Sequence, residues 1–308
     1  MSDVVILFSG QGAQKVGMGK DFYESSAMAR DLFQRADEVL GFPLSAVMFE
    51  GPDEELTRTS RCQPALYLHG LVALAMLRER VSGLNPVAAA GLSLGEFTAH
   101  AAAGTFSFED GLRLVARRGL FMEEACSATR GAMAALIGGE EDGVKALAAE
   151  CGVDVANFNA PGQIVLSGTV EGIDAAVEKA RDHGIRRAIK LNVAGAYHSR
   201  LMQSAQDQLA SELAGVAMRS PSLPVVCNFG ASEVSDPAEI RSMLEKQVTG
   251  SVRWTESIRL LCDRGHRNFI ELGPGKVLAG LVAKIEKEAI VRSVEDLASL
   301  EAVVEQLG

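Results

Sequence analysis

Hydrophobic and polar positions along the chain predict alternating strands and helices. Residues 4–8 form a short apolar run that ends in Ser-Gly-Gln-Gly, which is typical of a buried strand entering a glycine loop. Apolar residues at helical spacing predict a helix over 27–40, and Gly41 gives that helix a stop signal. Pro64 is suited to the first turn of a helix, so we expect a second apolar helix from there to about Val81.

The alternation continues to about residue 126. Residues 87–90 predict a strand of small apolar side chains, and Gly104 ends the helix expected after it. Ser107, with Asp110 three residues later, resembles a capping box and predicts one more helix. Strands that alternate with helices indicate an α/β protein with a parallel sheet.

A different order of elements follows residue 127. The pattern predicts in turn a strand, a helix, a hairpin of two strands, a helix and a strand, over 131–137, 140–151, 153–158, 163–167, 170–183 and 187–193. This β-α-β-β-α-β order is the ferredoxin-like pattern. We therefore expect a small subdomain over 128–194, inserted into an α/β body formed by 1–127 and 195–308. The body resumes with expected helices from 201, over 251–264 and after 275, and with strands over 223–227 and 268–271.

Composition and charge narrow the class of protein. The 308 residues are 47% hydrophobic and 23% charged, which describes a globular chain able to bury a large core and argues against disorder. The net charge of −10 argues against nucleic acid and anionic membranes as general partners, because both require a basic surface. No apolar run approaches the ~20 residues that span a membrane, and no basic leader precedes residues 4–8.

Cysteine and histidine usage adds two expectations. The five cysteines are odd in number and none lies in a C-x-x-C spacing, which favours a reduced cytoplasmic protein without a disulfide framework. The five histidines form no metal-ligand pair, so we expect no metal site.

A candidate nucleophile lies at Ser93. The sequence Gly91-Leu92-Ser93-Leu94-Gly95 fits the G-x-S-x-G nucleophile elbow, with an apolar strand before it and a helix after it. Small residues permit the sharp turn that exposes the serine hydroxyl, and the backbone N–H of Leu94 can then face a developing oxyanion. The alternative is a plain glycine turn with a solvated serine.

His198 is the candidate base for this nucleophile. It lies in Gly195-Ala196-Tyr197-His198-Ser199, where an expected strand gives way to a helix, and α/β folds place reactive groups at strand ends. His183 lies in a polar helix end, which favours a solvated side chain. His69 and His100 lie on apolar helices, which is typical of core histidines, and His266 lies in a polar turn.

Two further features allow two interpretations each. The loop after the first strand, Ser9-Gly10-Gln11-Gly12, could supply a second oxyanion donor or could be an ordinary strand-to-helix turn. Arg117 and Arg118 lie together in a mostly apolar helix, so one could point inward towards an anion, or both could extend to solvent.

Taken together, these segments resemble the malonyl-CoA:acyl-carrier-protein transacylase family, the acyltransferases of fatty-acid and polyketide synthesis. The resemblance covers nearly the whole chain. It rests on ordered motifs at Gly10–Gln14, Gln63–Ala65, Gly91–Glu96, Arg118–Gly119 with Met122, Asn159–Gln163, Gly195–Ser199 and Glu271–Leu278. The fold it implies is an α/β-hydrolase-like body with a ferredoxin-like subdomain, which agrees with the insert predicted above.

The resemblance implies a role for each matching residue. Ser93 would carry the malonyl ester and His198 would act as general base and then as general acid. Arg118 would bind the free malonyl carboxylate through a bidentate pair. The backbone N–H groups of Gln11 and Leu94 would form the oxyanion hole, and the backbone carbonyl of Gln247 would orient the histidine. Gln63 and Asn159 would line the pocket.

The resemblance also implies substrates and partners. The expected reaction is ping-pong transfer of malonyl from malonyl-CoA to the phosphopantetheine thiol of holo acyl carrier protein, by a monomer without metal or redox cofactor. Family members usually have His where this chain has Leu92, which puts in doubt any substrate contact made by that histidine. Tyr197, just before the base, matches an aromatic position typical of malonyl-specific relatives.

Two other functions use the same residues. An acyl-thioester hydrolase or esterase would need Ser93 and His198 but has no use for a buried Arg118. A carrier-protein or CoA-binding module without activity would need neither the serine nor the histidine.

Overall fold

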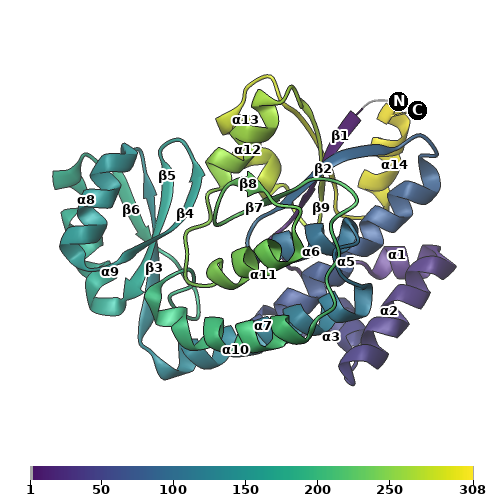
Figure 1. Ribbon diagram of the computed structural model, residues 1–308, viewed down its shortest axis with the longest axis horizontal. Coiled ribbons are helices and arrows are strands. Elements are labelled where there is room, and N and C mark those ends of the chain that lie inside the picture. Colours follow the sequence, from purple (N-terminus) through teal and green to yellow (C-terminus); the bar gives the residue numbers. More distant parts are fainter. Residues whose placement is uncertain (1–2, 308) are drawn as a thin grey trace.

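The computed structural model describes residues 3–307, which form two sheets surrounded by helices (Figure 1). Within that range the larger sheet has the strand order β10-β9-β1-β2-β7-β8. Its strands are β1 (Asp3–Phe8), β2 (Asn85–Gly91), β7 (Val225–Cys227), β8 (Ser232–Glu233), β9 (Asn268–Leu272) and β10 (Ile290–Val294). All neighbours pair in parallel except β7 and β8, so the body has the expected parallel sheet.

Alternating side chains of β1 face two separate cores, as the twofold period of a strand requires. Val4, Ile6 and Phe8 contribute to the larger core, whereas Val5 and Leu7 contribute to the smaller one. The larger core includes helices α2 (Ala27–Leu40), α5 (Thr59–Arg80), α6 (Leu94–Ala102), α7 (Phe108–Ala128), α10 (Gln203–Gly215), α11 (Pro237–Lys246) and α14 (Leu297–Leu307). Short helices α1 (Lys20–Ser25), α3 (Leu44–Glu50) and α4 (Asp53–Thr57) also contribute to it.

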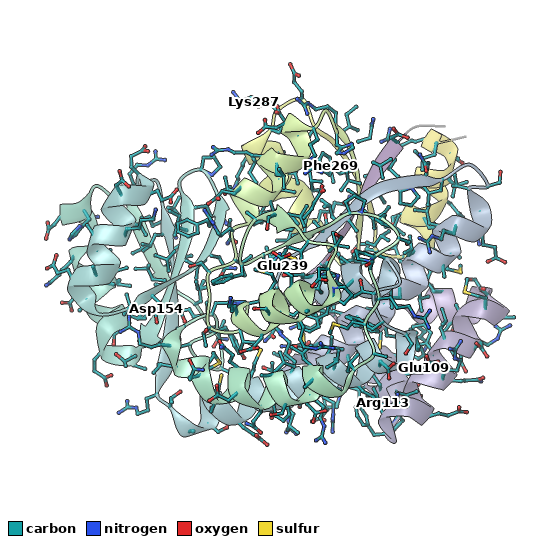
Figure 2. The ribbon with its side chains drawn as sticks, viewed as in Figure 1. Glu109, Arg113, Asp154, Glu239, Phe269 and Lys287 are labelled. Atoms are coloured by element: carbon teal, nitrogen blue, oxygen red, sulfur yellow. The ribbon has the colours of Figure 1, made fainter. Side chains whose placement is uncertain are left out.

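The opposite face of the sheet is covered by α12 (Trp254–Asp263) and α13 (Val277–Ile285), which Figure 1 shows together at the top of the view. Phe269 of β9 is fully buried in this smaller core, whereas Lys287, beyond α13, is exposed (Figure 2). With helices on both faces, both sides of the central strands are removed from water. In residues 3–307 no helix is long and apolar enough to cross a membrane.

The second sheet is antiparallel and has the order β4-β5-β3-β6. Along the chain its elements are β3 (Gly131–Ile137), α8 (Glu141–Cys151), β4 (Asp154–Ala160), β5 (Gln163–Thr169), α9 (Val170–Lys179) with the 3₁₀ turn Ala180–His183, and β6 (Arg187–Lys190). Both helices pack on the sheet in a third core. The ferredoxin-like pattern predicted from the sequence is confirmed, while the exact limits 128–194 for the subdomain stay a prediction.

The predicted helix start at Pro64 is wrong, because α5 begins at Thr59. Proline removes one backbone donor, so the turn before it needs support from elsewhere. That support comes from α7: the N–H of Ser60 donates to Glu123 at 3.1 Å, and the carbonyl of Thr59 lies so close to Gly119 that a Cβ there would be 2.5 Å from it. Tertiary contacts therefore extend the helix beyond its sequence signal.

Two other expected elements are shorter than the pattern suggested. The last strand of the subdomain ends at Lys190 instead of 193, and residues 191–194 line a pocket. The helix expected from 251 begins at Trp254, because Val252 pairs with β4 as an isolated bridge to Asn157. Residues 191–194 and Val252 thus connect the subdomain to the body instead of extending the strand and the helix.

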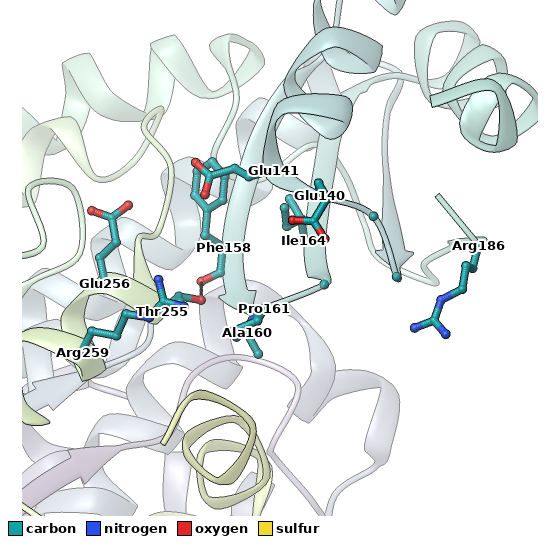
Figure 3. A pocket seen from close by; sticks show the side chains of 13 residues that line it. Glu140, Glu141, Phe158, Ala160, Pro161, Ile164, Arg186, Thr255, Glu256 and Arg259 are labelled. Carbon is teal, nitrogen blue, oxygen red and sulfur yellow. Dashed lines mark hydrogen bonds between the residues drawn. The ribbon is translucent and has the colours of Figure 1, made fainter. Parts of the chain in front are cut away.

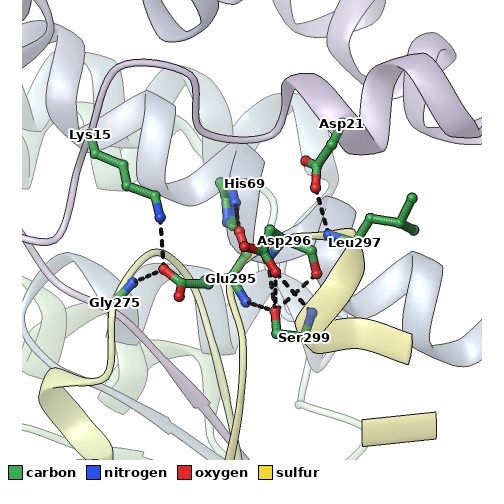
Figure 4. Close-up of polar contacts among 8 residues, drawn as sticks. All are labelled: Lys15, Asp21, His69, Gly275, Glu295, Asp296, Leu297 and Ser299. Atoms are coloured by element: carbon green, nitrogen blue, oxygen red, sulfur yellow. Dashed lines mark hydrogen bonds and ion pairs between the residues drawn. The ribbon is translucent and has the colours of Figure 1, made fainter. Parts of the chain in front are cut away.

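A set of polar contacts links the loop after β1, helix α1 and helix α5 to the C-terminal part of the body (Figure 4). Lys15 Nζ donates to the Glu295 carboxylate at 2.8 Å, and the N–H of Gly275 donates to the same oxygen at 3.0 Å. The ring of His69 donates through Nε2 to the backbone carbonyl of Glu295 at 3.1 Å. Asp21 accepts the N–H of Leu297.

His69 makes the stability of the fold dependent on pH. Burial lowers its pKa to about 4, so between that value and the usual 6.5 the unfolded chain binds a proton that the folded chain does not. His69→Gln keeps an N–H donor for Glu295 but cannot titrate. As pH drops from 6 to 5, we expect the free energy of unfolding to fall more steeply in the wild type than in the variant. The difference between the two slopes should be about 1 kcal/mol per pH unit. Urea denaturation over this range measures both slopes, and equal slopes would contradict the prediction.

Candidate active site

Ser93 lies at a strained turn between β2 and α6. Its φ of 54° and ψ of −104° are unusual for a residue with a side chain, as a nucleophile elbow requires. The turn is possible because two glycines allow close backbone approach. A Cβ on Gly91 would lie 2.0 Å from the backbone of Gly95, and one on Gly95 would lie 2.2 Å from the carbonyl of Phe8.

The structure brings His198 to the hydroxyl of Ser93. Ser93 Oγ lies 2.8 Å from His198 Nε2, and His198 Nδ1 lies 2.8 Å from the backbone carbonyl of Gln247. A carbonyl can only accept, so Nδ1 carries the proton and Nε2 presents a lone pair to the serine. The sequence expectation for all three positions is therefore matched by their geometry.

His198 is held neutral at physiological pH. Burial, followed by the nearby positive charge of Arg118, lowers its pKa to about 4. A neutral imidazole with a free Nε2 lone pair can take a proton from a serine hydroxyl, which a protonated ring cannot.

Arg118 points inward and Arg117 points outward, which resolves the alternative left open by the sequence. Arg117 is exposed and pairs with Glu212 at 3.3 Å, whereas Arg118 is only 1% exposed. Arg118 Nη2 donates to Ser93 Oγ at 3.0 Å. Burial lowers its pKa to about 10, so the guanidinium stays charged at neutral pH.

Two side-chain amides and one aromatic ring also contact this cation. Arg118 Nη1 donates to Gln63 Oε1 at 2.8 Å, and Nη2 donates to Gln247 Oε1 at 2.9 Å. The ring of Phe97 lies 5.2 Å from the guanidinium carbon. Nε has no hydrogen-bond partner among the described residues. The charge is thus buried with Nε unpaired, which is costly unless an anion completes the site.

Of the two residues predicted for an oxyanion hole, Leu94 directly follows the nucleophile and Gln11 lines the pocket beside it. Leu94 is the first residue of α6, so its N–H has no partner inside the helix and adds to the positive end of the helix dipole. Gln11 lines the same pocket as Ser93, and its side chain donates to Thr59 and Tyr197 at 3.4 Å each. Their role in holding an oxyanion stays a prediction.

A pocket of about 540 Å³ opens beside Ser93 and His198, within the usual range for small-molecule sites. Leu92 lines it, so the position where relatives usually carry histidine offers an apolar surface here. Tyr197 and Asn159 also line the pocket, as expected, and the Oδ1 atom of Asn159 is buried without a partner in the described structure. Gln63 does not line it but lies behind Arg118.

The other histidines lie outside this pocket. His69 and His100 are fully buried on helices, as predicted, and His183 pairs with Glu150 at 2.8 Å. Within residues 3–307 one group could offer three metal ligands, namely Glu96, His100 and Cys227, whose ligand atoms lie within 4.8 Å of one another. No sequence pattern indicated this group, and none of its members lines the pocket beside Ser93.

A second hollow, of about 610 Å³, lies between the subdomain and α12 (Figure 3). Glu140, Glu141 and Arg186 line it from the subdomain, and Glu256 and Arg259 line it from the body. Charges of both signs line its wall, and neither Ser93 nor His198 reaches it.

Two residues of the site were missed from the sequence. Asn228 accepts the N–H of Ser93 at 2.6 Å and donates to the carbonyl of Gly91 at 2.8 Å, so it braces the elbow from both sides. The sequence could have indicated Asn228 as a site residue, because it is the first polar residue after the expected strand that ends at Cys227. Glu96, directly after the elbow motif, is fully buried, and the sequence predicted no role for it.

Comparison with known proteins agrees with the fold and site. Residues 5–304 match the acyl transferase domain family, and the chain belongs to that family. Its relatives include malonyl CoA-acyl carrier protein transacylase of Bacillus subtilis (strain 168), 42% identical over all of this chain and 98% of the relative. The counterpart of Staphylococcus aureus (strain MRSA252) is 38% identical over 96% and 97% of the two chains.

Solved structures extend the similarity to three dimensions. Acyl-carrier-protein-S-malonyltransferase from Bartonella henselae superimposes with a TM-score of 0.94 at 38% identity, over 100% of both chains. A malonyl-transacylase solved in complex with its type II polyketide-synthase acyl-carrier protein gives 0.95 at 35% identity, over 99% and 100%. The family resemblance of the sequence motifs and the predicted fold class are confirmed.

The close backbone contacts at the elbow predict that two glycine-to-alanine substitutions will have opposite effects on stability. Gly95→Ala would force a Cβ against the carbonyl of Phe8, and such overpacking typically costs about 1–3 kcal/mol. Gly280→Ala is the matched control, because Gly280 lies in α13 with open space around it, where alanine favours the helix by up to ~1 kcal/mol. We expect the first change to lower Tm and the second to leave it equal or higher. A Gly95→Ala protein as stable as Gly280→Ala would contradict the packing described here.

Proposed function

We propose that the protein transfers a malonyl group from malonyl-CoA to the phosphopantetheine thiol of acyl carrier protein, through a malonyl ester on Ser93. The observation that carries this is the buried Arg118 guanidinium, 3.0 Å from the hydroxyl that also bonds His198. A nucleophile beside a buried cation suits an acyl group that ends in a carboxylate. The names of the relatives, malonyl transacylases that act on acyl carrier protein, support the same substrates.

The first half-reaction makes the ester. Ser93 Oγ attacks the thioester carbon while its proton passes to His198 Nε2, and the carbonyl oxygen becomes an oxyanion that the N–H groups of Gln11 and Leu94 would hold. Each such donor is typically worth about 10²–10³ in rate. The carbon–sulfur bond then breaks, and coenzyme A leaves as a thiol with the proton from His198.

The second half-reaction reverses these steps with a new thiol. His198 takes the proton of the phosphopantetheine thiol, whose sulfur attacks the ester of Ser93, and the proton returns to the departing serine oxygen. Both halves exchange one acyl bond for another of similar energy. The chain's own groups suffice for this route, and the absence of a metal or redox cofactor stays a prediction.

Arg118 would hold the malonyl carboxylate through one edge of its fork. Nε has no partner, and Nη2 now donates to the hydroxyl that acylation consumes. Nε and Nη2 form one edge of a guanidinium, the geometry that takes both oxygens of a carboxylate. Tyr197 on the pocket wall supports the smaller malonyl over branched acyl groups, as the family resemblance implied. The monomeric state and cytoplasmic location expected from the sequence also stay predictions.

The ester itself is the first test. Intact-mass spectrometry after mixing with malonyl-CoA should show one malonyl increment on the wild type, none on Ser93→Ala, and loss of the increment when holo carrier protein is added. His198→Ala should acylate slower by several decades, because the base is removed. His183→Ala is the control and should acylate normally.

The same experiment separates the alternatives. An increment lost in water before any thiol is added would favour a hydrolase. A wild type that never labels would favour a binding module without activity.

The second test concerns Arg118, with Arg117 on the same helix as its matched control. Removing Arg118 leaves the substrate carboxylate desolvated and unpaired, which typically costs ~2–5 kcal/mol, or roughly 30-fold to several thousandfold in kcat/KM for malonyl-CoA. Acetyl-CoA has no carboxylate, so Arg118→Ala should spare acetyl transfer, and Arg118→Lys should restore malonyl transfer only in part. Arg117→Ala should alter neither rate. Equal losses for both substrates in Arg118→Ala would show that Arg118 is structural.

A further inference from the structure

One oxygen of Glu96 joins two segments that are far apart in the sequence. Glu96 lies in the first turn of α6, three residues after Ser93, and is fully buried. Its Oε2 atom accepts the backbone N–H of Asn228 at 2.9 Å and the side-chain Nε2 of Gln247 at 2.6 Å. These partners follow β7 and α11, so the carboxylate ties both segments to the elbow.

Asn228 carries this support to the nucleophile. With its backbone fixed by Glu96, its side chain accepts the N–H of Ser93 and donates to the carbonyl of Gly91. The strained turn at Ser93 therefore persists because its N–H and the carbonyl two residues before it are both bound by one buried amide.

Gln247 carries the support to the base and to the cation. Its backbone carbonyl accepts His198 Nδ1, its side-chain oxygen accepts Arg118 Nη2, and its side-chain nitrogen donates to the carbonyl of Ser93 at 2.9 Å as well as to Glu96. All four partners are buried, so water cannot take the place of a hydrogen bond that is lost here.

We propose that Glu96 is a positioning residue for the acyl transfer: its Oε2 atom sets the distance between Ser93 and His198 by holding Asn228 and Gln247 in place. This inference rests on the proposed function only where its test measures acyl transfer. Glu96 itself touches neither the substrate pocket nor the reacting atoms.

Both hydrogen bonds that Glu96 accepts from the network use Oε2, and Oε1 takes no part in them. Oε1 has no hydrogen-bond partner in the described structure and faces His100 Nε2, also unpartnered, at 4.0 Å. Burial raises the pKa of Glu96 to about 7, with Asn228, Gln247 and Cys227 acting in the opposite direction. A proton on Oε1 leaves Oε2 free to accept both N–H groups, so the bracing persists in either protonation state.

The experiment compares Glu96→Ala with Glu96→Gln. The amide oxygen of Gln can accept both donors, and its NH2 group would face the His100 nitrogen. We expect Glu96→Ala to lower kcat for both malonyl and acetyl transfer by about 100-fold, the typical effect of a displacement near 1 Å, with KM for malonyl-CoA nearly unchanged. Glu96→Gln should retain most of the wild-type kcat.

Thr98→Ala is the matched control, since it removes another buried side chain of α6 that makes none of the hydrogen bonds described above, and it should leave kcat unchanged. All rates are measured at a temperature where denaturation curves show each variant fully folded. Glu96→Ala that keeps more than about a tenth of the wild-type kcat, or Glu96→Gln as slow as Glu96→Ala, would overturn the proposal. An equal loss in Thr98→Ala would assign the effect to packing around α6 and overturn it as well.

A second readout does not depend on activity. In protein with ¹⁵N-labelled histidine, the His198 Nδ1–H that donates to Gln247 should give a protected imidazole signal in the wild type and in Glu96→Gln, and lose that protection in Glu96→Ala. Retained protection in Glu96→Ala would contradict the inference. If the wild type takes no malonyl label, the proposed function fails, yet the imidazole signal still decides the role of Glu96.

Discussion

The hydrogen bond from His198 to the backbone carbonyl of Gln247 is the interaction on which the chemistry of the site depends. A carbonyl has no proton to give, so it fixes the imidazole tautomer and turns the free nitrogen towards Ser93. A carboxylate in the same place would orient the ring but would also raise its pKa through a full negative charge. Burial and Arg118 lower the pKa of His198 to about 4, and the hydrogen bond to the Gln247 carbonyl acts in the opposite direction. The base is therefore ready to accept a proton at physiological pH.

Arg118 is a buried cation at the site, and under the proposed function it would select the acyl group. The guanidinium is buried among uncharged partners, Gln63, Gln247 and the Ser93 hydroxyl, and its nearest acidic neighbour, Glu96, has a pKa raised to about 7. Burying a cation without a full counter-charge is unfavourable, and the rest of the fold must offset that cost. A carboxylate on the acyl group would supply the missing charge. The same buried charge that costs folding free energy would thus favour a dicarboxylic acyl group over a plain one.

The pocket exists because two separately packed parts of the chain meet at it. Leu92 and Leu281 come from the body, whereas Met133 and Val165 come from the antiparallel sheet. The connection between them includes residues 191–194, which leave the sheet at β6, and Val252, which pairs with β4 before α12 begins. Substrate would therefore lie between the two units, with Ser93 on the body side.

The sequence by itself determined the alternation of strands and helices, the ferredoxin-like insert, the elbow at Ser93 and the family, because hydrophobic period, glycine turns and ordered motifs are local properties of the chain. It did not predict α11, β10 or α14. Tertiary structure decided what depends on contacts between distant residues. It placed Arg118 inward and Arg117 outward, although the two are neighbours on one helix. It extended α5 before Pro64 through contacts with α7, and it joined Glu96 to Asn228 and Gln247. No local pattern reports such pairings, because each bond links segments whose separation in the sequence carries no information about their distance in space.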